Sequence, residues 1–471
     1  MRVLEQYEPR EALRYFEEIC AIPHGSRDTK RISDYCVRFA REHGFAYVQD
    51  EYNNVVIYKP GTKGYEEHPP VILQGHLDMV CEKSPDCDID FSKDGLRLRC
   101  DGEYIFAEGT TLGGDDGIAV AYALAVLAAD DLKHPPIEAV FTVDEEIGML
   151  GADAMDMSVF KGRILLNCDS EDEGILTVSC AGGVTSMLTR PVSREACAGQ
   201  VWRMGVKNLI GGHSGVEINK GRANASKTLA AVLQALPVRL ISIDGGSKDN
   251  AIPRSCEALV VANDPKEAFC TRAEQIKQLL PAAESEAEFY CVPAESDLVP
   301  MNEESSRAVI ALLNALPNGV QKMSEDIAGL VQNSLNLGIL KTQADAVTMT
   351  FSVRSSVNTE KAALIDELKA VGLAHGAGYD ESGAYPAWEY QKNSRLRDVM
   401  VSVFCNLYGK EPVVEAIHAG LECGIFSDRL PGLDAVSFGP QMHDIHTSRE
   451  RLDLASTERT WKYLLAVLER L

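Results

Sequence analysis

The chain has 471 residues, enough for two to four domains of roughly 150 residues each, and its 45% hydrophobic and 25% charged residues exclude collagen-like, low-complexity and wholly disordered proteins. Its 46 basic and 70 acidic side chains give a net charge of −24, which repels phosphate backbones and anionic lipid surfaces. We therefore expect neither nucleic acid nor a membrane among its partners.

Two features predict a cytoplasmic location. The N-terminal segment is charged and lacks the apolar core of a signal peptide, and the longest apolar run, residues 118–129, is too short to span a bilayer. The 13 cysteines are odd in number and scattered, unlike the dense spacing of a secreted disulfide framework. We expect reduced thiols in the cytoplasm.

The first part of the chain predicts an α/β domain. A helix follows Ser26 and ends before Gly44, with apolar residues at helical spacing. Short β-rich runs, interpreted as strands, occupy residues 55–58, 71–74, 139–143 and 164–167. A nearly all-apolar helix begins near Asp116, between the second and third of these runs. Strands separated by helices predict a mostly parallel sheet covered on both faces.

From about residue 183 the pattern changes to that of an α+β domain. Its predicted elements are a glycine-rich turn, a helix and two strands, at residues 211–215, 223–236, 258–262 and 348–354. The α/β pattern then returns, with a helix at 396–408 and an apolar strand at 435–439. We expect one domain formed by residues 1–182 and 385–471, interrupted by an inserted domain at 183–384. No internal repeat is visible in the sequence.

Acidic residues and histidines gather in five places near the predicted strands. His76 and Asp78 are two residues apart at the end of an apolar strand, so both side chains point the same way and one could orient the other as a ligand. Taken alone, such a pair is more often a structural hydrogen-bonded pair. The other four clusters contain Asp115 with Asp116, Asp144 with Glu145 and Glu146, Asp169, and His443 with His446.

Each of these four clusters also has a plain structural interpretation. Asp115 and Asp116 follow two glycines and could simply cap the apolar helix, because a helix N-terminus favours carboxylates. The acids at 144–146 could form a solvated loop, Asp169 could begin an acidic turn, and isolated histidines are usually surface residues. The Walker lysine and the dinucleotide-binding glycine pattern are both missing near Asp115, which disfavours nucleotide binding.

Taken together, the clusters favour a metal site. They coincide with the carboxyl ends of predicted strands, where open α/β sheets build their functional sites. Histidine and carboxylate ligands without cysteine predict zinc, with cobalt or manganese as substitutes. Two histidines and three carboxylates suffice for two ions if one carboxylate bridges them.

An ordered set of motifs resembles the co-catalytic di-zinc peptidase family that includes carboxypeptidase G, aminoacylase and peptidase T, and in particular its bacterial dipeptidases. The similarity covers essentially the whole chain, and its motifs include QGHLDMVCEK, GTTLGGDDGIA, DEEIGMLGA, GGHSGVEINKGRANA, HAGLECG and HTSRE. The resemblance implies a phosphorylase/hydrolase-like zinc-peptidase catalytic domain. It also implies that the inserted domain is a lid that forms a homodimer.

The resemblance implies the metal ligands residue by residue. Asp115 would bridge two divalent ions. His76 and Asp169 would complete one site, and Glu146 and His446 would complete the other.

The same resemblance implies the catalytic groups. Glu145 would be the general base, and Asp78 would hold His76 in its ligating tautomer. His446 is preferred to His443 as the ligand because Thr-Ser-x-Glu follows it, similar to the ending of the family motif.

The substrate contacts implied by the resemblance lie mostly in the inserted domain. His213 would reach the active site of the partner subunit and help to bind the carbonyl oxygen. Asn250 and Arg354 would contact the substrate, with the arginine gripping its free carboxylate. Asp116 and Glu422 are candidates for binding the free amine, although both could be structural.

These residues favour the hydrolysis of dipeptides. The family resemblance implies a broad preference that includes Xaa-His dipeptides such as β-alanyl-histidine. Two zinc ions would share a water and lower its pKa, Glu145 would accept its proton, and the resulting hydroxide would attack the peptide carbonyl. One alternative is an N-acyl-amino-acid amidohydrolase that uses the same metal ligands. Two others are a non-catalytic ligand-binding homologue and a protein without metal whose acids are merely solvated.

Overall fold

The computed structural model describes residues 2–471, and the chain divides into two compact units. The first unit contains the chain up to Cys180 together with Tyr390–Ala416 and Leu421–Leu471. The second unit contains Ala181–Glu389 and the short segment Ile417–Gly420, which the sequence analysis did not anticipate.

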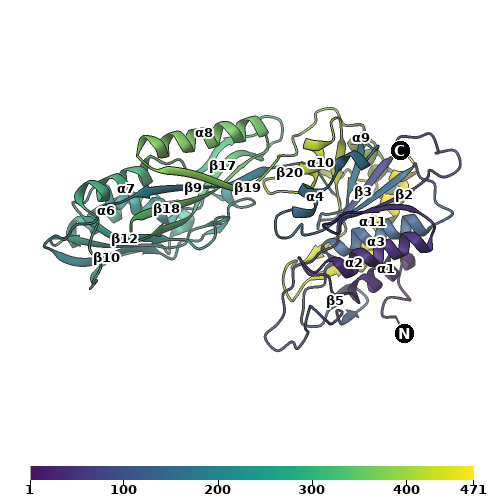
Figure 1. Cartoon of the computed structure of the whole chain (residues 1–471), viewed down its shortest axis with the longest axis horizontal. Coiled ribbons are helices and arrows are strands. Elements are labelled where there is room, and N and C mark those ends of the chain that lie inside the picture. Colours follow the sequence, from purple (N-terminus) through teal and green to yellow (C-terminus); the bar gives the residue numbers. More distant parts are fainter. Residues whose placement is uncertain (1) are drawn as a thin grey trace. The chain divides into compact units, whose positions relative to one another are not determined.

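The first unit is built on an eight-stranded sheet (Figure 1). In spatial order its strands are β1 (Ala46–Gln49), β2 (Val55–Lys59), β6 (Ile137–Thr142), β3 (Val71–His76), β7 (Ile164–Asn167), β21 (Asp434–Ser437), β8 (Ile175–Cys180) and β20 (Val413–Ile417). The four central strands β6, β3, β7 and β21 are parallel to one another. Their carboxyl ends therefore meet at one edge of the sheet.

The prediction of a mostly parallel sheet is wrong for the outer strands. The pairs β1–β2, β2–β6 and β21–β8 are antiparallel. Only residues 50–54 connect β1 to β2, and so short a connection joins antiparallel neighbours, because a parallel pair needs a crossover of a dozen or more residues. The sheet is mixed, with a parallel centre.

Helices cover both faces of this sheet. They are α1 (Arg10–Cys20), α2 (Lys30–Glu42), α3 (Gly114–Ala128), α4 (Leu150–Ala154), α9 (Arg395–Tyr408), α10 (Cys423–Arg429) and α11 (Leu454–Leu468). Every residue of β3 and β6 is buried, which requires cover on both sides. Val71 and Leu73 belong to the core that includes α1, α3 and α11, while Ile72 between them faces the opposite layer.

The apolar helix α3 lies very close to β3. Gly75 permits this approach, because a Cβ there would come within 2.7 Å of the Ala119 side chain and of the Asp116 carboxylate. The α3 segment begins at Gly114, but Asp115 and Asp116 have non-helical backbone angles. The regular helix therefore begins just after Asp116, close to the predicted start. The two aspartates precede it with an irregular backbone and lie beside His76.

A small four-stranded sheet completes the first unit. Its strands are β22 (Met442–His443), β23 (Arg451–Asp453), β5 (Tyr104–Ala107) and β4 (Leu98–Cys100). Antiparallel pairing of β22 with β23 closes the loop between them, which carries His446 and Glu450.

The second unit is built on a nine-stranded antiparallel sheet with helices α6, α7 and α8 on one face (Figure 1). Its strands are β9 (Gly182–Pro191), β10 (Gln200–Lys207), β12 (Arg239–Gly245), β14 (Cys256–Ala262), β15 (Glu288–Pro293), β16 (Gly319–Met323), β17 (Val331–Thr342), β18 (Ala346–Ser355) and β19 (Gly378–Tyr385). Its helices are α5 (Ala225–Leu233), α6 (Lys266–Lys277), α7 (Glu303–Ala315) and α8 (Asn358–Ala374). The predicted α+β character of this region agrees with these elements.

Two short strands, β11 (Gly212–His213) and β13 (Ala251–Ile252), pair with each other in the second unit. The predicted turn at 211–215 thus includes a strand. Among the described residues, no helix combines the length and the apolar character needed to cross a membrane.

Candidate metal centre

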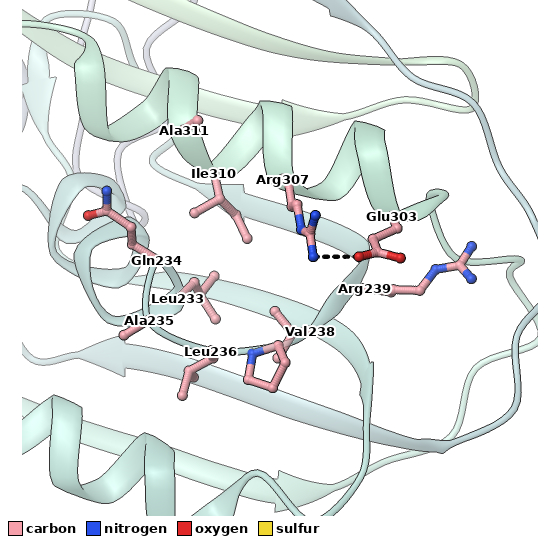
Figure 2. A pocket seen from close by; sticks show the side chains of 11 residues that line it. Leu233, Gln234, Ala235, Leu236, Val238, Arg239, Glu303, Arg307, Ile310 and Ala311 are labelled. Atoms are coloured by element: carbon pink, nitrogen blue, oxygen red, sulfur yellow. Dashed lines mark ion pairs between the residues drawn. The ribbon is translucent and has the colours of Figure 1, made fainter.

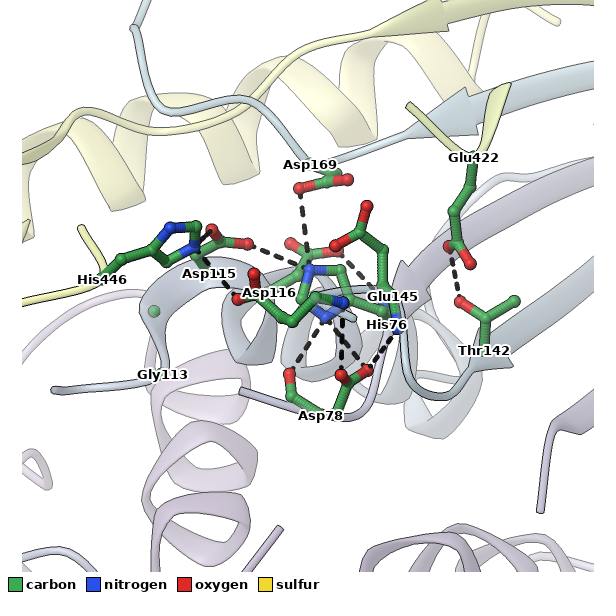
Figure 3. Close-up of polar contacts among 12 residues, drawn as sticks. His76, Asp78, Gly113, Asp115, Asp116, Thr142, Glu145, Asp169, Glu422 and His446 are labelled. Atoms are coloured by element: carbon green, nitrogen blue, oxygen red, sulfur yellow. Dashed lines mark hydrogen bonds and ion pairs between the residues drawn. The ribbon is translucent and has the colours of Figure 1, made fainter. Parts of the chain in front are cut away.

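Four parallel strands deliver acids and histidines to one place (Figure 3). His76 is the last residue of β3, the acids at 144–146 follow β6, and Asp169 follows β7. His446 lies in the loop between β22 and β23, which follows β21. The geometry is that of open α/β sheets, whose functional groups lie beyond the carboxyl ends of the strands.

Asp115 lies at the middle of this cluster. Its Oδ1 is 3.0 Å from Nε2 of His76, and its Oδ2 is 3.1 Å from Nε2 of His446. Glu146 Oε1 is 3.1 Å from the same His446 nitrogen, and Asp169 Oδ1 is 3.8 Å from Nε2 of His76. One carboxylate thus faces both imidazoles, and each imidazole has a second carboxylate beside it.

The donor atoms are close enough to share cations. His76, Asp116 and Asp169 form one group, and His76, Asp115 and Glu146 form another, with the ligand atoms of each group within 4.8 Å of one another. These oxygen and nitrogen donors suit zinc, cobalt or manganese.

The electrostatics of the cluster also fit bound cations. Burial and the charge of the neighbouring Asp116 raise the pKa of Asp169 well above its usual value. Burial and the surrounding carboxylates raise the pKa of Glu145 to about 8. Buried carboxylates this close repel one another unless protons or cations intervene, so the residues fit divalent ions as counter-charges.

Asp78 contacts His76 in a way that the sequence did not predict. His76 Nδ1 lies 3.0 Å from the main-chain carbonyl oxygen of Asp78 and 3.6 Å from its carboxylate. The carboxylate accepts hydrogen bonds from the Ser26 hydroxyl at 2.8 Å and from the main-chain N–H groups of Glu145 at 3.0 Å and Glu146 at 3.4 Å. Asp78 therefore also anchors the loop that carries the two glutamates.

The two C-terminal histidines lie in different surroundings. His443 pairs with Arg451 in the β22–β23 ladder, and its ring packs edge-on against Tyr104 with the centroids 5.7 Å apart. His446 instead faces Asp115, with a backbone φ of 58°. A left-handed φ is uncommon in a residue with a Cβ and often marks a functional site.

Glu450 lies behind the cluster and was not singled out by the sequence reasoning. Its side chain is buried and accepts hydrogen bonds from three consecutive main-chain N–H groups, those of Leu112 at 2.7 Å, Gly113 at 3.2 Å and Gly114 at 2.8 Å. This carboxylate holds the turn that leads directly into Asp115. Glu450 belongs to the TSRE motif, which the sequence analysis quoted. The motif does not indicate that this carboxylate contacts a glycine turn more than 300 residues away in the sequence.

Asp116 and Glu422, the candidates for amine recognition, are both fully buried. Asp116 Oδ2 accepts a hydrogen bond from the main-chain N–H of His76 at 3.2 Å. Glu422 Oε2 accepts hydrogen bonds from Gln74 and Thr142, both at 2.6 Å, and burial raises the pKa of Glu422 to about 7. Contact of either carboxylate with a substrate amine stays a prediction.

Comparisons with known proteins identify the family. The model of peptidase family M20/M25/M40 matches residues 72–470. The chain belongs to this family. It is 37% identical over 482 residues to the cytosol non-specific dipeptidase of Escherichia coli K12, covering 100% of this chain and 99% of the relative.

Solved structures agree with the family and with the predicted fold class. The aminoacylhistidine dipeptidase of Vibrio alginolyticus is 37% identical, with a TM-score of 0.93 over 99% of this chain and 98% of that one. Aminopeptidase PepT of Bacillus cereus shares the fold at 15% identity, with a TM-score of 0.58 over 98% of both chains. The resemblance to this peptidase family and the α/β peptidase fold class predicted from the sequence are confirmed.

The second unit of this M20 peptidase brings together other predicted site residues. His213 lies in β11 and Asn250 lies just before β13, the strand that pairs with it. Arg354, in β18, is buried and donates a hydrogen bond to the hydroxyl of Tyr385 at 3.0 Å. Its Nε is buried without a hydrogen-bond partner, so the guanidinium has donor capacity left for a ligand.

His418, in the return segment of the M20 peptidase chain, is another residue that the sequence did not predict. It is buried, and its Nε2 lies 2.7 Å from the hydroxyl of Ser334. Burial and the positive charge of Arg354 lower the pKa of His418 to about 3. His418 therefore stays neutral in the folded protein at physiological pH.

Glu450→Gln should weaken metal binding in this M20 peptidase. The amide would present an NH₂ group to N–H donors, releasing the turn before Asp115, and changes of this kind typically cost about 10–100-fold in metal affinity. Bound metal would be measured after dialysis against metal buffers, with Glu469→Gln, at an exposed pair with Lys133, as the control. Unchanged affinity in Glu450→Gln would contradict the positioning role.

Acid should destabilise the folded peptidase through His418. The unfolded histidine titrates near 6.5 and the folded one near 3, so the unfolded state binds more protons between these values and stability falls as pH drops through that window. From pH 7.5 to pH 5 this contributes about 2 kcal/mol of lost unfolding free energy. Urea titrations of chelator-treated protein should show this loss shrinking in His418→Gln and persisting in Ser334→Ala; equal losses in both would refute it.

Proposed function

We propose that the chain is a cytoplasmic metallodipeptidase that cleaves a broad range of dipeptides, including Xaa-His dipeptides such as β-alanyl-histidine. The observation that carries the proposal is the Asp115 carboxylate, with one oxygen beside each of two histidines. Relatives named as dipeptidases, alike over essentially their full length, support the substrate class.

The proposed metal ligands are Asp115 and the four residues that surround its carboxylate. Asp115 would hold two divalent ions, most readily zinc, together with His76 and Asp169 on one side and Glu146 and His446 on the other. When bound, the ions supply a water of lowered pKa and polarise the peptide carbonyl. Asp78 supports both sides, because it contacts His76 and holds the main chain of the two glutamates.

Glu145 is the proposed general base. It lies three residues beyond Thr142, the last residue of β6, and Figure 3 shows its side chain beside His76. Burial raises the pKa of Glu145 above that of a free carboxyl, and proton transfer is most efficient when the pKa of the base lies near the working pH. Glu145 takes a proton from the attacking water and passes it to the leaving amine.

The second unit supplies the proposed substrate contacts. Arg354 pairs with the free carboxylate of a dipeptide, and Asn250 contacts the substrate. His213 donates to the carbonyl oxygen as charge develops there. Asp116 and Glu422 are proposed to take part in recognition of the free amine. A homodimer formed through the second unit stays a prediction.

Hydrolysis of alanyl-histidine and β-alanyl-histidine tests the function directly. We expect about two ions per chain, cleavage of the dipeptides, and loss of cleavage on chelation that zinc restores. Bound metal and product would be measured in the same samples, with N-acetyl-alanine as the comparison substrate. Cleavage of the acylated compound alone would favour the amidohydrolase alternative, and protein without metal would overturn the site.

Substitution of the two adjacent glutamates should have different effects on metal content and turnover. Glu145→Gln should keep both ions and lose turnover by at least a hundredfold, because only proton transfer is removed. Glu146→Gln should lose metal, because it removes a ligand from the His446 side. Metal content and turnover of both variants would be compared at equal total zinc. Equal metal loss in the two variants would contradict the assignment of Glu145 as the base and Glu146 as a metal ligand.

A further inference from the structure

Three consecutive acids, Glu171, Asp172 and Glu173, follow the proposed metal ligand Asp169 in the first unit. From the sequence alone they could form a solvated turn in which all three carboxylates face water. The structure gives the three side chains different surroundings. Two of them are bound to neighbouring residues of the protein, and the third is not.

Asp172 and Glu173 both have partners. The Glu173 carboxylate accepts hydrogen bonds from Nε and Nη2 of Arg459, each at 2.6 Å. The Asp172 carboxylate accepts a hydrogen bond from Nε2 of Gln441 at 2.9 Å. These two acids therefore attach the turn to the C-terminal part of the first unit.

The carboxylate of Glu171 has no such partner. Its side chain is exposed, and in the described part of the chain no other residue donates a hydrogen bond to its carboxylate or forms an ion pair with it. A carboxylate that no cation of the protein neutralises can still bind a cationic group of a ligand.

Glu171 faces the metal centre. Partial burial and the negative charge of Asp115 raise the pKa of the Glu171 carboxyl, whereas His446 lowers it. Charges in contact with solvent are screened within roughly 8 Å at physiological ionic strength. The carboxyl therefore lies on the side of the turn that faces these two proposed metal ligands.

Main-chain contacts, and not the Glu171 side chain, fix the position of this turn. The carbonyl oxygen of Glu171 accepts hydrogen bonds from the main-chain N–H of Met442 at 2.8 Å and from Nε2 of Gln441 at 3.1 Å. A Cβ at Gly439 would come within 1.7 Å of the carbonyl oxygen of Ser170, so glycine is required for this close approach. Since Met442 begins β22, the turn lies between Asp169 and the loop that carries His446.

The free amine of a dipeptide is largely an ammonium group at neutral pH and needs an anion that it can reach. Asp116 and Glu422 are both fully buried. Asp116 accepts a hydrogen bond from the main chain of His76, and Glu422 accepts hydrogen bonds from Gln74 and Thr142. Their charge can favour an ammonium nearby, but direct contact requires an exposed carboxylate such as that of Glu171.

The pocket in the second unit does not offer such a carboxylate. It has a volume of about 610 Å³ and is lined by residues 233–239 and by α7 (Figure 2). Glu303, which lines it, forms an ion pair with Arg307 at 2.5 Å, and Arg239 adds a second positive charge. This pocket is therefore unsuited to an ammonium group.

We infer that Glu171 is a specificity-determining residue whose carboxylate pairs with the free amine of the dipeptide beside the metal centre. The inference rests on the proposed function and names the residue that contacts the amine, while Asp116 and Glu422 act on it through their charge. An acylated substrate presents no positive charge to this carboxylate. Glu171 would thus favour a dipeptide over an N-acyl-amino acid bound by the same metal ligands.

Removal of the amine from the substrate tests the inference. Zinc-loaded wild type, Glu171→Gln and Asp172→Asn would be compared on alanyl-histidine and on N-propionyl-histidine, which differs from it only in lacking the amine. We expect Glu171→Gln to raise KM for alanyl-histidine about 10–100-fold with little change in kcat, because an ion-paired hydrogen bond is lost from bound substrate and transition state alike. The same variant should treat N-propionyl-histidine as the wild type does.

Asp172→Asn is the matched control, because it removes the same charge from the neighbouring residue and keeps an oxygen that can accept from Gln441. It should leave the preference for alanyl-histidine unchanged. Where N-propionyl-histidine is cut too slowly, its inhibition constant gives the same comparison. An unchanged preference in Glu171→Gln, equal losses on both compounds, or an equal effect of Asp172→Asn would overturn the inference. A wild type that holds two ions and cuts no dipeptide would instead overturn the proposed function.

Discussion

The site depends on the concentration of buried negative charge at the carboxyl ends of four parallel strands. Asp115, Asp116, Glu145, Glu146 and Asp169 converge there around only two imidazoles. Such an arrangement is unfavourable for a folded chain alone, because buried like charges repel and lose their hydration. Divalent cations bound among these carboxylates would offset this repulsion, so the residues that need a counter-charge are the same ones that are suited to bind metal.

Much of the surrounding structure serves to keep these carboxylates in place. Glu450 holds the turn before Asp115, and Asp78 holds the main chain of Glu145 and Glu146. Both use a carboxylate as an acceptor for main-chain N–H groups, bonds that are stronger than neutral ones. Acidic residues thus occupy two layers, one that faces the ions and one that fixes the loops behind them.

The sequence predicted the parts of this site that local pattern encodes. His76, Asp115 and Asp169 each adjoin an apolar strand or helix, so their convergence followed from the rule that parallel strands end at one edge. Strand direction at 55–58 was not readable, because it depends on which neighbour a strand pairs with. Glu450 and His418 were missed for a related reason: their partners, the Leu112–Gly114 turn and Ser334, are distant in sequence and carry no mark of the contact.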